Sequence, residues 1–216
     1  MKVLSSVQLG LKTMTNLIEI CKLALLRPAR LYSRSEVLST PSPVPRMPGV
    51  YGWYFRDIPG EIPTEQCARL NDLTLLYIGI SPGAPPSNGK SPSKQTLFDR
   101  VRYHYRGNAE GSTLRLSIGC LLAETIGIQL RRVGSGRRLT FADGEKRLSD
   151  WMASNAFVVW SECDRPWLVE EQLISATHLP LNLDQNERHP FFPVLSESRR
   201  LAKNKAREMS IWNELV

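Results

Sequence analysis

Two short segments constrain the fold of this chain more than any other feature: Gly-Val-Tyr at 49–51 and Tyr-Ile-Gly at 77–79. Each places a tyrosine two residues from a glycine in a run of apolar and β-branched residues, which is typical of a buried strand. The runs predict strands over 49–55 and 74–80 that form a hairpin-like pair with a long connection. The fold must therefore contain a sheet in which neighbouring strands each carry a tyrosine.

The length and charge of the chain set loose limits on its class. Its 216 residues have room for one domain of ordinary size plus tails. The net charge of +7 comes from the two ends, because residues 48–195 hold sixteen basic and sixteen acidic side chains. The overall charge is thus a weak sign of a nucleic-acid partner, and the useful signal lies where arginines cluster.

The cysteines and the apolar runs indicate a cytoplasmic protein. The cysteines lie more than forty residues apart, without a Cys-x-x-Cys pair, which argues against a zinc site and a disulfide framework and fits a reducing compartment. The N-terminus has no signal-peptide pattern. The most apolar run, 17–26, is interrupted by Glu19 and Lys22 and is too short to cross a bilayer. We therefore expect no membrane association.

The chain divides into three parts. Apolar residues at helical spacing predict an amphipathic helix over 8–27, and a Ser/Pro-rich linker follows at 39–45. Residues 1–46 are expected to form a loosely docked element that the fold does not need. A compact domain is expected over 47–195, and a basic terminal helix within 196–216.

Inside the compact domain, helical and strand patterns alternate. Asp164 is a good N-cap with Pro166 in the first turn, so a helix is predicted from Asp164 to about His178. The other predicted helices cover 95–105, 112–125 and 144–154, and further strands cover 128–133 and 156–161. The class is α+β, with a small mixed or antiparallel sheet flanked by helices.

Five features in order resemble the GIY-YIG nucleases. The segment at 49–51 is a conservative variant of the first motif, and the segment at 77–79 is the second. A helix then carries Arg100 four residues before His104. Glu170 follows, with an apolar pair three and four residues later, and Asn182 comes after a proline-containing turn. The resemblance covers about residues 49–182.

The resemblance implies a role for each residue in cutting a phosphodiester bond. Tyr51 is assigned as the general base that activates water, and Tyr77 as the residue that holds the water or the phosphate. Arg100 is the phosphate clamp, His104 positions the water or moves a proton, and Asn182 has a neutral positioning role. A tyrosine normally has a pKa near 10, so an arginine and a divalent ion are expected to favour its phenolate form.

The resemblance also implies one metal ion, Mg²⁺ with Mn²⁺ as a substitute, held by Glu170. Glu171 is the competitor, but it points about 100° away on the helix. The residues alone leave a simpler interpretation open, in which the two tyrosines only pack in a half-buried sheet.

DNA, double-stranded or structured, is the expected partner, and its backbone is expected to meet exposed arginines. These are Arg102 and Arg106 on the predicted helix, and Arg131, Arg132, Arg137 and Arg138 on a predicted hairpin. The 26-residue spacing between the tyrosines and the long stretch before Glu170 resemble the restriction-enzyme branch of the family. The oligomeric state stays open between a monomer and a homodimer.

Two functions follow from this pattern. The first is a standalone Mg²⁺-dependent DNA endonuclease with a tyrosine-activated water, an arginine clamp and a single glutamate-bound metal. The alternative is a non-catalytic nucleic-acid-binding module on the same fold. Retention of the metal carboxylate favours the nuclease, because a binding module has no use for it.

Overall fold

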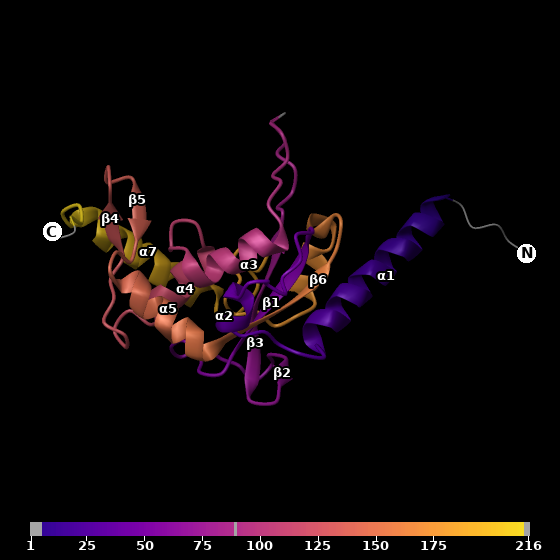
Figure 1. Cartoon of the computed structure of the whole chain (residues 1–216), viewed down its shortest axis with the longest axis horizontal. Helices are drawn as coiled ribbons and strands as arrows, with labels where there is room; N and C mark the ends of the chain where they lie inside the picture. Colours follow the sequence, from indigo (N-terminus) through magenta and orange to yellow (C-terminus); the bar gives the residue numbers. More distant parts are fainter. Residues whose placement is uncertain (1–5, 89, 214–216) are drawn as a thin grey trace, which may run out of the picture.

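The computed structural model describes residues 6–88 and 90–213, and it is built around a four-stranded antiparallel sheet (Figure 1). The strands are β1 (Gly49–Phe55), β2 (Arg69–Leu70), β3 (Leu73–Ser81) and β6 (Ala156–Glu162), in the order β2-β3-β1-β6. The central strand β1 therefore pairs with β3 on one side and with β6 on the other. The predicted α+β class and the pairing of the two tyrosine strands are confirmed.

Both faces of the sheet are buried, so β1 has no solvent face. Its alternate residues Tyr51, Trp53 and Phe55 contribute to one core, whereas Val50 and Tyr54 contribute to the other. This follows from the two-residue period of a strand, which sends successive side chains to opposite faces. The tyrosine of the first motif thus lies in the first core.

Different helices cover the two faces. Buried side chains of α2 (Arg34–Leu38), α3 (Leu97–Arg106), α4 (Thr113–Leu121) and α5 (Gly144–Asn155) belong to the first core. Those of α1 (Ser6–Leu26) and α6 (Glu170–Ser175) belong to the second. A small second sheet, β4 (Arg131–Val133) with β5 (Arg138–Thr140), lies beside α7 (Phe192–Glu208) at the end of the molecule far from α1 (Figure 1).

The single helix predicted from Asp164 to His178 is wrong. The chain instead forms a short 3-10 helix, η1 (Pro166–Leu168), and then α6. The 3-10 turn closes with bonds from Leu168 N–H to Arg165 O and from Val169 N–H to Pro166 O, at 3.0 and 3.1 Å. The break brings Val169 fully into the second core and makes Glu170 the first residue of α6.

The N-terminal segment does not behave as the loosely docked element expected for residues 1–46. Leu25 of α1 is fully buried in the second core, and the Tyr54 hydroxyl donates to its carbonyl oxygen at 2.7 Å. Farther along, Tyr32 and Val158 exchange two backbone hydrogen bonds, so the segment also reaches the free edge of β6. Helix periodicity indicated an apolar stripe on α1 but not the surface that the stripe covers.

We expect Leu25→Ala to lower the free energy of unfolding by about 2–5 kcal/mol, because it removes a fully buried side chain from the second core. Leu23→Ala is the matched control on the same helix, since Leu23 is 59% exposed and should change stability by less than about 0.5 kcal/mol. Urea denaturation of the full chain measures both. Equal effects would mean that α1 does not complete the core.

Candidate active site

The two motif tyrosines lie on the same face of the sheet. The register pairs Tyr51 with Gly79 and Trp53 with Tyr77, so the tyrosines are diagonal neighbours across β1 and β3. Their ring centroids are 6.5 Å apart. Directly opposite and diagonal pairs on one face are within reach of aromatic side chains. The sheet therefore brings both phenols to one place.

The glycines of the two motifs are required by close approach. A Cβ atom at Gly79 would lie 2.5 Å from the Tyr51 hydroxyl oxygen, a distance that real Cβ atoms essentially never show. A Cβ atom at Gly49 would overlap the carbonyl oxygen of Ser161 and lie 2.7 Å from Leu97 Cδ1. The glycines thus let the Tyr51 ring lie against β3 and let α3 pack close to β1.

Helix α3 brings Arg100 and His104 to the phenols. It starts at a capping box, in which the Thr96 and Asp99 side chains each bond to the other's backbone N–H. His104 Nε2 lies 2.9 Å from the Tyr51 hydroxyl oxygen. One turn earlier, Arg100 donates to Gly111 O at 2.7 Å, and its charge acts on the Tyr51 phenol. The predicted arginine and histidine are therefore both next to Tyr51.

A serine that the sequence pattern did not single out completes this chain of contacts. Ser112 Oγ lies 2.7 Å from His104 Nδ1 and also accepts a bond from the Arg115 N–H at 3.1 Å, as the N-cap of α4. Both Ser112 and His104 are fully buried. The predicted start of a helix at residue 112 was the only sequence signal for Ser112.

Burial keeps these groups neutral. It raises the pKa of Tyr51 and of Tyr77 above the ordinary value, although the charge of Arg100 acts in the opposite direction, as expected. Burial, together with the charges of Arg100 and Arg115, places the pKa of His104 well below 6.5. Around neutral pH the site therefore holds a protonated Tyr51 and an uncharged His104.

Glu170 and Glu171 lie on different sides of α6. Glu170 lines a small pocket of about 50 Å³ together with Tyr77, Thr113 and Asp184. Glu171 lines a separate, larger pocket. Consecutive helical residues point about 100° apart, so only one of the pair can face the tyrosines. In this structure that residue is Glu170.

The Glu170 carboxylate is in an environment that disfavours a lone negative charge. Burial raises its pKa, a bond from Gln185 Nε2 at 3.3 Å opposes the rise, and the nearby Asp184 adds to it. A divalent cation would relieve this repulsion between carboxylates, so the donor set fits a hard, oxygen-preferring ion. Across the described part of the chain, no three His, Cys, Asp or Glu side chains form a complete metal cage. Substrate and water would have to supply most ligands.

Asn182 supports the second motif from the side. Its Oδ1 accepts from the Ile78 N–H at 3.0 Å, and its Nδ2 donates to the Ile78 carbonyl at 2.8 Å. The neighbouring Leu181 N–H donates to Leu76 O at 3.0 Å. A single amide therefore pairs with β3 at the residue between Tyr77 and Gly79, in the way a neighbouring strand would.

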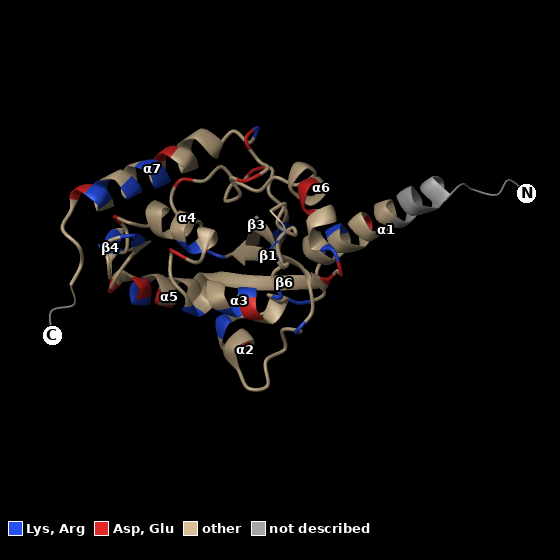
Figure 2. Cartoon of the chain, turned by 90° about the horizontal axis from the view of Figure 1, so that it is seen from above, with Lys and Arg blue, Asp and Glu red and all other residues tan. Residues whose placement is uncertain are grey.

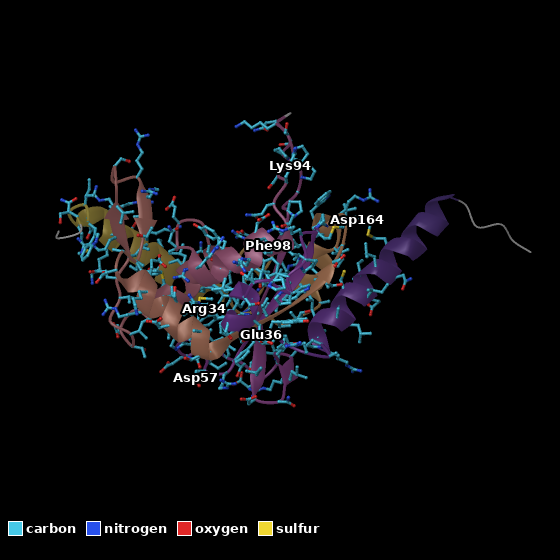
Figure 3. All side chains as sticks on the ribbon, in the orientation of Figure 1. Arg34, Glu36, Asp57, Lys94, Phe98 and Asp164 are labelled. Atoms are coloured by element: carbon cyan, nitrogen blue, oxygen red, sulfur yellow. The ribbon has the colours of Figure 1, made fainter. Side chains whose placement is uncertain are left out.

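The arginines predicted to contact nucleic acid have different surroundings. Arg102 packs on the Phe98 ring and donates to Val37 O at 2.7 Å. Figure 3 shows Phe98 on α3 and Lys94 on the loop that projects beyond it. Arg106 is exposed. Arg131 and Arg132 donate to carbonyl oxygens of the segment after α7, whereas Arg137 and Arg138 are exposed. The blue segments of α7 in Figure 2 mark further Lys and Arg residues along this helix.

The fold and the site together define an α+β domain that gathers two tyrosines, an arginine, a histidine and a partly buried carboxylate. The family model of the GIY-YIG catalytic domain matches residues 49–201, which is more than half of the chain, so the chain belongs to this family of nucleases. The match extends past Asn182 into α7. No curated protein and no solved structure matches the chain. Within the described residues, no helix is both long and apolar enough to cross a membrane.

The depressed pKa of His104 predicts a pH dependence of stability. An unfolded histidine takes up a proton below about pH 6.5, whereas the buried one does not, so the folded state loses about 1.4 kcal/mol per pH unit below that value. Unfolding free energies measured in urea between pH 7.5 and 5.5 give this slope. The glutamine of His104→Gln cannot titrate. The slope of unfolding free energy against pH should therefore fall by close to the contribution of one proton, about 1.4 kcal/mol per pH unit. An unchanged slope would show that His104 does titrate in the folded protein.

Proposed function

We propose that this protein is a divalent-metal-dependent endonuclease that hydrolyses phosphodiester bonds in DNA. The observation that carries the proposal is the convergence of Tyr51, Tyr77, Arg100 and His104 on the face of the sheet next to the Glu170 carboxylate. In-line hydrolysis needs a base for the attacking water and positive charge for the phosphoryl oxygens. These five side chains can supply both.

The hydrogen bonds suggest how Tyr51 acts as a base although burial raises its pKa. Because His104 is uncharged, it can accept from the Tyr51 hydroxyl at Nε2 while its Nδ1–H donates to Ser112 Oγ. As Tyr51 takes a proton from the attacking water, its own proton passes to His104. Arg100 stabilises the negative charge that develops on the phosphate.

Glu170 is the proposed metal ligand, with Asp184 as the nearby second carboxylate. A bound Mg²⁺ or Mn²⁺ would supply a Lewis acid for the phosphate and the leaving oxygen. Asn182 keeps its positioning role, since its side chain is fully used in holding Ile78. The four cysteines are free thiols, which suits the proposed cytoplasmic location.

The alternative, a binding module without catalysis, is less well supported. A carboxylate kept partly buried beside Tyr77, with a raised pKa and a second carboxylate nearby, repels a nucleic-acid phosphate unless a cation is present. A module that only binds nucleic acid would bind it more tightly without this carboxylate.

Glu170→Gln separates the two functions. The change keeps the size of the side chain but removes the metal ligand, so we expect cleavage of plasmid DNA in Mg²⁺ to fall by at least about 100-fold. DNA binding, measured by fluorescence anisotropy, should persist. Tyr51→Phe should be as damaging, and the double variant should lose far less than the product of the single losses.

Glu171→Gln is the matched control for this experiment, because Glu171 lies on the other side of α6. At saturating DNA it should cut nearly as fast as the unmodified protein. Slow cleavage by Glu171→Gln would show that Glu171, and not Glu170, holds the metal. Unchanged cleavage in both variants would leave the binding module as the better description.

The exposed arginines predict the salt dependence of DNA binding. Replacing Arg137 and Arg138 by glutamine should flatten the slope of log affinity against log salt by up to about 0.9 for each phosphate that the protein no longer neutralises. Replacing Arg131 and Arg132 should affect stability as well, since they bond to the segment after α7. A slope that the Arg137 and Arg138 replacements leave unchanged would place the β4–β5 hairpin away from the DNA.

A further inference from the structure

A second pocket lies on the side of α6 away from the tyrosines. Its volume is about 760 Å³, within the range of about 300–1,000 Å³ that is usual for small-molecule sites. Glu171 lines this pocket, Glu170 lines the small one, and Ile174 lines both. The two pockets are therefore neighbours that share a helix.

Two residues that line the pocket each carry a buried polar atom without a hydrogen-bond partner. His189 is 7% exposed, and its Nε2 has no partner. The hydroxyl of Thr177 is also buried and has none. Both residues line the pocket. Buried polar groups in native proteins are nearly always satisfied, so these two indicate a missing ligand or an ordered water.

The hydrogen bonds of His189 decide which of its nitrogens carries the proton. Its Nδ1 accepts from the Phe191 N–H at 3.0 Å, so Nδ1 uses its lone pair. Burial and the neighbouring His178 lower the pKa of His189 to about 4, so the ring is neutral near pH 7. The single proton must therefore sit on Nε2. In this tautomer Nε2 has no free lone pair, so it can donate a hydrogen bond but cannot coordinate a metal ion.

The charges and shapes around the pocket favour a neutral planar ligand. Its charged lining is Glu171, Glu187 and Arg188, so carboxylates outnumber the guanidinium and an anion is disfavoured. Gln66 and Gln185 add amide groups to the lining. The rings of His178 and His189 contact each other, with centroids 4.1 Å apart and planes inclined by 53°, and together they give the pocket an aromatic wall.

We propose that this pocket binds an unpaired nucleobase of the substrate strand, with a base carbonyl oxygen or ring nitrogen accepting from His189 Nε2 and Thr177. The proposal rests on the proposed nuclease function for its substrate. Enzymes that hold a base outside the helical stack read it through hydrogen bonds to its edge and through stacking. The protein would thus select DNA in which a base next to the cut is unpaired or easily unpaired.

Titrations followed by NMR test the proposal without requiring cleavage. The probes are the four deoxynucleosides, an abasic oligonucleotide that presents phosphates without bases, inorganic phosphate, and Zn²⁺. We expect at least one nucleoside to shift the Thr177 amide and the His189 ring signals saturably at millimolar concentration. The abasic oligonucleotide, phosphate and Zn²⁺ should leave these signals in place.

Two variants give the matched comparison. Thr177→Val keeps the shape but loses the hydroxyl, so nucleoside binding should weaken by about 2- to 10-fold, the range expected for one hydrogen bond. Ser175→Ala should not change it, because the Ser175 hydroxyl already donates to Gln172 O at 3.2 Å.

Several outcomes would overturn the proposal: no saturable nucleoside shift, a response to phosphate or Zn²⁺ alone, or equal binding in Thr177→Val. Its failure is distinct from failure of the nuclease function. Nucleoside binding should persist in Glu170→Gln, whatever that variant does to cleavage, because Glu170 lies outside this pocket.

Discussion

The contact between the Tyr51 ring and the backbone of Gly79 fixes the geometry of the candidate site. The β1–β3 register places the two residues opposite each other, and the missing side chain at position 79 leaves the ring room to lie against β3. Only in that position does the hydroxyl lie 2.9 Å from His104 Nε2. A methyl group at position 79 would move the ring, and with it the start of the contacts that end at Ser112.

A buried arginine holds the helices that carry these contacts. Arg115 is fully buried, and its guanidinium pairs with the Glu145 carboxylate and donates to His104 O and Glu145 O. It joins α4 to the end of α3 and to α5. Losing one partner of such a pair leaves an uncompensated charge in the interior. The same charge lowers the pKa of His104, so the scaffold also sets the protonation of the site.

The sequence predicted the parts of the fold that depend on local pattern. The strand over 49–55 is confirmed, and the strand over 156–161 is one residue longer than expected, because their apolar runs are uninterrupted. The break between η1 and α6 was missed, since the burial of Val169 is a tertiary effect that overrides a good N-cap at Asp164. The docking of α1 was missed because an amphipathic pattern does not identify its partner.

In the candidate site, too, the sequence predicted the residues that belong to local motifs and missed those that depend on packing. The motifs indicated Tyr51, Arg100 and His104 as neighbours, and the structure brings them together. Ser112 and Asp184 were not singled out, because each reaches the site from an element whose position depends on packing. Spacing on the helix favoured Glu170 over Glu171, and the orientation of α6 agrees with that preference.

The side-chain amide of Asn182 has a consequence for how this protein behaves among other chains. Beyond the two residues paired with β2, the outer edge of β3 would present bare backbone groups, which are a template for an added strand. Asn182 and Leu181 occupy the backbone groups of Ile78 and Leu76 there. The segment that carries the second motif is apolar and β-prone, so this cover also protects the folded protein from edge-to-edge aggregation.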